Sequence, residues 1–143
     1  MIVPDANLLI YAHDSTSPNH GKAKEWWENA LSGREPVWIP FVVALAFVRL
    51  TTHPALNENP MTAAMAPERV ESWEKAPVVR FLSGSSATLR LAWEFLEAAE
   101  AGGNLTTDAM IAAHAAEIGG IVYSNDRDFD RFSKIRWRNP LTA

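Results

Sequence analysis

The chain of 143 residues contains no cysteine. This absence excludes a disulfide scaffold, a thiolate zinc site and a cysteine nucleophile, and it agrees with a reducing compartment. No apolar stretch approaches the length of about 20 residues that a membrane helix needs, and no basic segment precedes the first apolar run. We therefore expect a cytoplasmic protein that does not enter a membrane.

Positive charge is also scarce, with 13 Lys and Arg against 17 Asp and Glu and a net charge of −4. This balance argues against a surface coated in positive charge for indiscriminate nucleic-acid binding, although a local basic patch stays compatible with it. Hydrophobic residues make up 48% of the chain, which is typical of a compact globular protein. The length suits one core, so we expect a single domain over residues 1–143.

Apolar runs alternate with amphipathic segments along the chain. The runs predict short strands near residues 1–4, 37–39, 78–82, 121–124 and 135–137. The amphipathic segments predict helices near residues 8–12, 21–31, 41–50, 67–75, 87–101 and 108–118. Strands that alternate with helices favour parallel pairing with helices on both faces of the sheet. The predicted fold is a three-layer α/β/α sandwich with a central parallel sheet.

Two helices carry further expectations. In the helix at 87–101, Leu89, Ala92 and Trp93 recur at helical spacing, so Trp93 is interpreted as a core residue rather than a binding platform. The alanine-rich helix is expected to be capped by Thr106 or Thr107 and to end at a glycine pair. His114 lies among alanines within that helix, which favours a buried packing role.

Asp5 interrupts an apolar run that begins at the first residue. An ionised carboxylate is costly inside a buried element unless something compensates it. Parallel sheets place ligand-facing residues beyond the carboxyl ends of their strands, so Asp5 suits a site. It equally suits the N-cap of the helix that follows, and the two interpretations have similar weight when the residue is considered alone.

Two further carboxylates are expected at the same edge of the sheet. Asp126 follows the strand at 121–124, and Asp108 lies in the first turn of the helix that precedes that strand. Carboxylates gathered in this way repel one another and suit Mg²⁺ or Mn²⁺, which need no His or Cys. Asp128 and Asp130 could join them, but we expect one of these two to bind backbone amides of its own loop.

Five stretches together resemble those of the PIN domains, and within that family the VapC toxins of bacterial toxin–antitoxin pairs. They are Asp5-Ala6-Asn7, Trp38-Ile39-Pro40 with Phe47-Val48-Arg49 and Thr51-Thr52-His53-Pro54, Thr107-Asp108-Ala109, Ser124-Asn125-Asp126-Arg127-Asp128-Phe129, and Trp137-Arg138-Asn139-Pro140. The resemblance covers essentially the whole chain in order.

The resemblance implies a Mg²⁺-dependent endoribonuclease, with Mn²⁺ as a possible substitute. It implies catalytic and metal-binding roles for Asp5, Asp108 and Asp126, with Asp128 in support. It also implies a VapB antitoxin that holds the enzyme inactive, and a homodimer. In the proposed mechanism the metal assists in-line attack on an RNA phosphodiester.

Further residues surround these carboxylates. Asn7 and Thr107, which adjoin the acidic positions, are expected to support them. Arg49 and Arg127 are candidates for RNA phosphate contacts, since arginine often serves phosphate recognition. For Arg49, a plain role as a surface cation at a helix end is equally compatible with the sequence.

Position 46 departs from the family's pattern, which has Glu where this chain has Ala46. No other carboxylate lies between Glu35 and Glu58, so no neighbour can replace it. Loss of an acidic ligand should weaken metal binding or misorient the attacking water. A deliberate substitution that makes a toxic protein tolerable to its host is favoured over natural decay, because the rest of the pattern is intact.

Two alternatives to a working ribonuclease follow from the same residues. The first is a catalytically inactive binding module of the same fold, acting on RNA or as an antitoxin decoy, and Ala46 favours it. The second is an acid phosphatase-like hydrolase with Asp5 as nucleophile, which would require a second Asp two residues later. Asn7 occupies that place.

Overall fold

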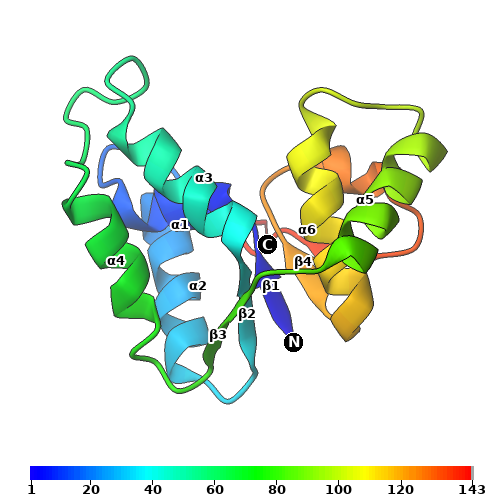
Figure 1. The fold of residues 1–143 in the computed structure, drawn as a ribbon. Coiled ribbons are helices and arrows are strands. Elements are labelled where there is room, and N and C mark those ends of the chain that lie inside the picture. Colours follow the sequence, from blue (N-terminus) through cyan, green and yellow to red (C-terminus); the bar gives the residue numbers. More distant parts are fainter. Residues whose placement is uncertain (143) are drawn as a thin grey trace.

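The computed structural model describes residues 1–142, which form a five-stranded parallel sheet with helices on both faces (Figure 1). The strands are β1 (Ile2–Pro4), β2 (Val37–Pro40), β3 (Val79–Leu82), β4 (Ile121–Tyr123) and β5 (Arg136–Arg138). Their spatial order is β3-β2-β1-β4-β5, and every neighbouring pair is parallel. The predicted three-layer α/β/α sandwich is therefore confirmed.

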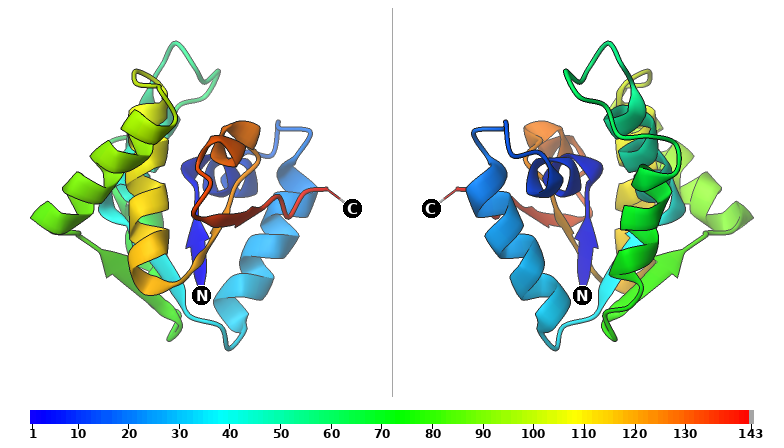
Figure 2. Two further views of the ribbon diagram at one scale, coloured as in Figure 1. Left: turned by 90° about the vertical axis from the view of Figure 1, so that its right-hand side faces the viewer. Right: turned by 90° about the vertical axis from the view of Figure 1, so that its left-hand side faces the viewer.

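Within the described residues 1–142, six α-helices and one 3-10 helix connect the strands. They are α1 (Ala6–His13), α2 (His20–Ser32), α3 (Phe41–Thr52), α4 (Met65–Trp73), α5 (Ser86–Ala98), α6 (Leu105–Ile118) and the 3-10 helix η1 (Arg127–Arg131). In Figure 2, α2 and the α5–α6 pair flank β1 from opposite sides. Helix α3 packs against both α1 and α6, so it links the two helical layers. No helix within residues 1–142 is long and apolar enough to cross a bilayer.

The parallel register brings the carboxyl ends of the strands to one edge. Pro4 of β1 pairs with Tyr123 of β4, which in turn pairs with Arg138 of β5. Asp5 and Ser124 follow directly at this edge, and the amide of Asp5 donates to the carbonyl oxygen of Tyr123 at 2.8 Å. The central position of β1 between β2 and β4 accounts for the burial of its side chains on both faces.

An aromatic cluster fills the core between α1, α2, α3 and α4. Trp73 packs edge-on against Phe47 and Trp27, with ring centroids 4.9 and 5.6 Å away. His13 joins the cluster, and its Nδ1 lies 2.8 Å from the carbonyl oxygen of Leu9. This cluster fixes α3, which carries Ala46 and Arg49, against the rest of the fold.

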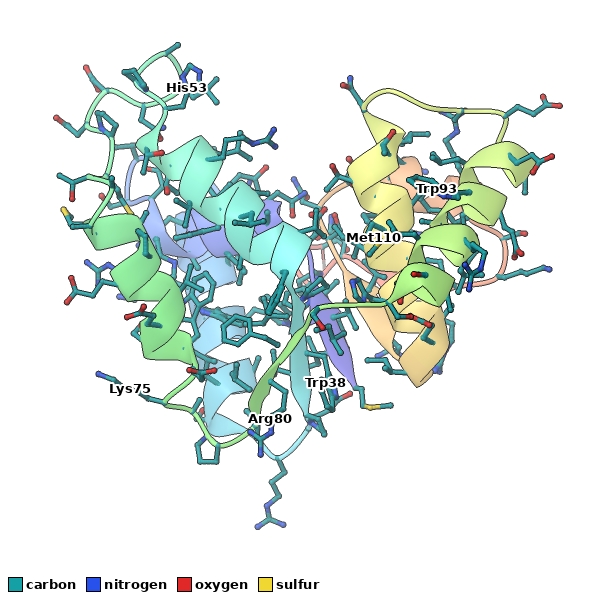
Figure 3. All side chains as sticks on the ribbon, in the orientation of Figure 1. Trp38, His53, Lys75, Arg80, Trp93 and Met110 are labelled. Carbon is teal, nitrogen blue, oxygen red and sulfur yellow. The ribbon has the colours of Figure 1, made fainter. Side chains whose placement is uncertain are left out.

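The expectation that Trp93 belongs to the core is wrong. Trp93, which Figure 3 labels on α5, is 51% exposed. Leu89 on the same helix is 44% exposed. Helix α5 instead buries Thr88, Ala92 and Phe95 against its neighbours. The spacing of apolar residues predicts which side of a helix is buried only to within about one residue. The packing of α5 on α6 buries the side chains of the adjacent helix face instead. The prediction for His114 is confirmed, since it is 3% exposed.

Helix starts also differ from expectation. Helix α1 begins at Ala6 rather than near residue 8, and α4 begins at Met65 and ends at Trp73. Helix α6 begins at Leu105 with Asn104 as N-cap, so Thr106 and Thr107 lie inside its first turn and do not cap it. Asp108 keeps its predicted place in that first turn.

Candidate metal centre

Three carboxylates converge beyond the carboxyl ends of β1 and β4. Asp108 comes from the first turn of α6, Asp126 from the segment after β4, and Asp128 from η1. Each offers one oxygen, and these oxygens lie within 4.8 Å of one another. Asp108 and Asp126 are half-buried, whereas Asp128 is exposed. The cluster is therefore open to solvent on one side.

Asp5 is not part of this group of three and forms a different set of bonds. Its side chain is 8% exposed. Oδ1 accepts the amide of Ala6 at 2.7 Å, which makes Asp5 the N-cap of α1, and Oδ2 accepts the hydroxyl of Ser124 at 2.6 Å. The capping interpretation from the sequence is thus confirmed, and the charge of Asp5 also raises the pKa of Asp108.

Ser124 joins Asp5 to the segment that carries Asp126. The Ser124 hydroxyl donates to Asp5 and accepts the backbone amide of Asp126 at 2.9 Å and the side-chain amide of Asn7 at 3.3 Å. The side-chain oxygen of Asn7 accepts the amide of Asn125 at 3.3 Å. Asn7 therefore contacts this segment twice.

Electrostatic repulsion is built into the cluster. Burial, together with the charges of Asp5, Asp126 and Asp128, raises the pKa of Asp108 to about 7. Burial also raises the pKa of Asp5, although the bonds from Ser124 and Ala6 oppose that effect. Carboxylates with raised pKa values in one place favour either a bound proton or a bound cation.

The residues present fit a divalent metal ion. The donors are carboxylate oxygens alone, the ligand type that suits Mg²⁺ and Mn²⁺, and a cation would neutralise the repulsion that raises the pKa of Asp108. The gathered set is Asp108, Asp126 and Asp128, so Asp128 takes the place expected for Asp5 among the closest oxygens.

The loop after β4 is held together differently from the prediction. Oδ1 of Asp126 itself accepts the amide of Asp128 at 2.8 Å, and Oδ1 of Asp130 accepts the indole N–H of Trp137 at 2.7 Å. The expectation that Asp128 or Asp130 binds backbone amides of the loop is therefore wrong. Asp126 closes this turn, and the carboxylate of Asp128 lies near those of Asp108 and Asp126.

Ala46 lies in a neighbouring pocket between α3 and α6. The pocket holds about 400 Å³ and is lined by Val42, Leu45, Ala46, Arg49 and Thr107. Thr107 directly precedes Asp108, so this pocket adjoins the acidic cluster. Arg49 is exposed at its rim, and Arg127 is exposed at the start of η1 between Asp126 and Asp128.

The sequence interpretation missed the bonding roles of Ser124, Asn125 and Asn139. Ser124 lies between β4 and Asp126. A polar residue directly after an apolar strand was the feature of the sequence that could have identified it. Asn125 and Asn139 bond to each other across 14 residues, with 2.9 Å between Nδ2 of Asn139 and Oδ1 of Asn125. No local spacing in the sequence indicates that contact.

The structure is thus a three-layer α/β/α sandwich with acidic residues gathered beyond the carboxyl ends of its strands. The chain belongs to the PIN domain family, whose model matches residues 2–135. Within that family it groups with the VapC proteins. It is 32% identical to Ribonuclease VapC33 of Mycobacterium tuberculosis over 141 residues, which is 99% of each chain. It is 36% identical to Ribonuclease VapC37 of the same species over 140 residues, which is 98% of this chain and 97% of VapC37.

Solved structures share the fold. VapC20 of M. tuberculosis, a Sarcin-Ricin loop cleaving toxin, superposes with a TM-score of 0.71 at 21% identity and covers 95% of this chain and 99% of its own. A chain of VapBC2 from Rickettsia felis, bound to a DNA fragment from their promoter, superposes with a TM-score of 0.67 at 18% identity. That match covers 97% of this chain and 98% of the other.

Proposed function

We propose that this chain is a divalent-metal-dependent endoribonuclease toxin of the VapC type, weakened by Ala46. The observation that carries the proposal is the convergence of Asp108, Asp126 and Asp128 within 4.8 Å on a PIN fold. The relatives named Ribonuclease VapC match over almost their full lengths, which supports the same reaction class here.

In this proposal Asp108, Asp126 and Asp128 hold Mg²⁺ or Mn²⁺, and Asp5 adds its negative charge to the site. A metal bound there would position the phosphodiester, lower the pKa of a water and stabilise the leaving oxygen. Asp5 is fixed by Ser124 and Ala6, so its role is to orient the strand ends and to strengthen the field of the site.

Two exposed arginines are suited to bind the RNA backbone. Arg49 lines the pocket beside Thr107, and Arg127 is the residue between Asp126 and Asp128 in the sequence. Guanidinium groups bind phosphate oxygens in a fork geometry, and flanking cations would offset the repulsion between RNA and the carboxylates. We assign both arginines to phosphates next to the bond that is cleaved.

Ala46 favours a second candidate function, a PIN-fold binding module without catalysis. The methyl group at position 46 supplies no ligand to the pocket that it lines. An inactive module would still bind RNA or an antitoxin through the same surfaces. The two functions differ in whether restoring a carboxylate at position 46 creates or strengthens RNA cleavage.

The test compares the parent chain with Ala46→Glu and with Ala46→Gln as a matched control without charge. We expect Ala46→Glu to raise Mn²⁺ affinity and metal-dependent RNA cleavage, whereas Ala46→Gln leaves both near the parent level. Asp108→Asn in the Ala46→Glu background should abolish both. If folded Ala46→Glu binds Mn²⁺ but cleaves no RNA with Mg²⁺ or Mn²⁺, the enzyme proposal is wrong and the binding module remains.

We also propose a VapB-type antitoxin partner and a homodimer. The structural neighbours include VapBC complexes from Rickettsia felis and Haemophilus influenzae, which supports the antitoxin. Exposed apolar side chains on α3 and α5 offer surfaces for such contacts, namely Phe41, Leu45, Leu89 and Trp93. Light scattering of the parent and of Leu45→Glu tests this dimer. If the dimer forms, the parent has twice the mass of one chain.

A further inference from the structure

Asn139 follows β5 and lies outside the group of acidic residues. Both the oxygen and the nitrogen of its side-chain amide nevertheless form hydrogen bonds. Its Oδ1 accepts the backbone amide of Leu141 at 3.0 Å, and its Nδ2 donates to Oδ1 of Asn125 at 2.9 Å. A backbone N–H can only donate, so the bond from Leu141 determines which end of the Asn139 amide is the oxygen. Its NH₂ group must therefore face Asn125.

The orientation of Asn125 follows from that of Asn139. Because Oδ1 of Asn125 accepts from Asn139, its Nδ2 points the other way and lies 3.4 Å from the hydroxyl of Tyr11 on α1. The backbone amide of Asn125 donates to Oδ1 of Asn7 at 3.3 Å. The residue is thus held by three groups from α1 and from the segment after β5.

This residue lies in the short irregular segment that carries Asp126. Residues 124–126 belong to neither β4 nor η1, so regular backbone bonding does not fix their conformation. Asp126 itself is bonded locally, to the Ser124 hydroxyl and to the Asp128 amide. Ser124 and Asn125 are bonded to residues distant in sequence. These bonds are Ser124 to the Arg138 carbonyl at 3.0 Å, to Asp5 at 2.6 Å and to Asn7 at 3.3 Å, and the bonds of Asn125 to Asn7, Tyr11 and Asn139.

We propose that Asn139 is a positioning residue for the acidic cluster. It holds Asn125, and through Asn125 it sets the place of Asp126 relative to Asp108 and Asp128. Partners that orient ligands without touching a metal typically change its affinity by about 10–100-fold when they are removed. This inference rests on the proposed metal-dependent function, and it extends the site to the segment that follows β5.

The experiment measures Mn²⁺ binding by calorimetry at a temperature where all variants are folded. Asn139→Ala should weaken Mn²⁺ binding by about tenfold. Asn57→Ala is the matched control, since Asn57 is also half-buried and donates to the carbonyl oxygens of Leu50 and His53 at 2.7 and 2.9 Å, away from the carboxylates. It should lower stability and leave Mn²⁺ affinity unchanged.

A second readout needs no metal. In the metal-free protein, Asn139→Ala should speed hydrogen exchange at the backbone amides of Asn125 and Asp126, while the amides of β1 keep the parent's rates. If Asn139→Ala does not fold, Asn139→Ser replaces it, because a serine hydroxyl can still accept the Leu141 amide but is too short to reach Asn125. The same tenfold loss is expected from that variant.

Asp108→Asn distinguishes a failure of the positioning role from a failure of the proposed metal centre. If it abolishes Mn²⁺ binding while folded Asn139→Ala and Asn139→Ser bind as the parent does, the positioning role is wrong and the proposed metal centre stands. If Asp108→Asn itself binds Mn²⁺ like the parent, the proposed metal centre and the positioning role are both wrong.

Discussion

The hydroxyl of Ser124, at the end of β4, lies 2.6 Å from Oδ2 of Asp5, at the end of β1. Ser124 is fully buried and Asp5 is 8% exposed, so solvent cannot readily replace this bond. A hydroxyl has one proton to donate, and here it goes to the carboxylate. Its lone pairs accept from Asp126 and Asn7. One atom therefore joins the strand ends that carry the acidic residues.

Ser124→Ala should destabilise the protein by about 1–3 kcal/mol, because it leaves a buried carboxylate short of a donor. The pKa of Asp5 should rise further, since one of the two bonds that lower it is lost. Urea unfolding at pH 7 measures the change. Ser32→Ala is the control, because that exposed hydroxyl bonds only to carbonyl oxygens of its own helix and its loss should cost less than about 0.5 kcal/mol. Equal effects of the two substitutions would contradict the role of Ser124.

Asp108 should make the metal-free protein less stable as the pH rises. Its pKa is about 7 in the folded state, against an ordinary value of 3.8, so between these pH values the folded state holds a proton that the unfolded state has released. Stability therefore falls from about pH 4 to about pH 7 and levels off above. Since the group is partly exposed, we expect a total loss of about 1–3 kcal/mol.

The comparison with Asp108→Asn isolates this contribution from other titrating groups. Urea unfolding in EDTA should give similar stabilities for the two proteins at pH 4, and the variant should be the more stable one at pH 8. A difference that is the same at both pH values would show that the pKa of Asp108 is not raised.

The sequence predicted the layers and the strand order along the chain because hydrophobic periodicity reflects burial directly. It also predicted that Asp5, Asp108 and Asp126 come to one edge, since parallel strands end together. It could not predict that Asp128 rather than Asp5 completes the closest group. That choice depends on the turn of η1, which Asp126 closes by bonding the Asp128 amide, and on the hydroxyl of Ser124, which binds one oxygen of Asp5.

Side-chain direction was the other part that the sequence left open. The row of Leu89 and Trp93 is as apolar as the row that α5 buries, so periodicity does not distinguish them. Contacts such as the 2.6 Å bond from Thr88 to Glu117 help to select the buried row. Such contacts join residues 29 positions apart and exist only once the fold has formed.

Gly84→Ala should destabilise the protein by about 1–3 kcal/mol. Gly84 has φ +82°, which a residue with a side chain rarely adopts, and an added Cβ would lie 3.0 Å from Cε1 of the buried His114. Gly102→Ala is the matched control, because nothing lies within 4 Å of its added Cβ and its φ is not positive. That change should be neutral or slightly stabilising, since alanine restricts the unfolded chain. Thermal unfolding of both variants measures the difference, and a loss in Gly102→Ala as large as in Gly84→Ala would contradict the steric argument.

Arg49 should contribute one phosphate contact to RNA binding. It lines the pocket that adjoins Thr107, whereas the equally exposed Arg69 lies on α4, away from the carboxylates. Arg49→Gln should weaken binding of a labelled single-stranded RNA without metal, and the slope of log affinity against log salt should fall by about 1. Arg69→Gln removes the same charge, so it controls for the general field of the protein and should leave the slope unchanged. Equal slopes for the two variants would assign Arg49 to the plain role of a cation at the end of α3.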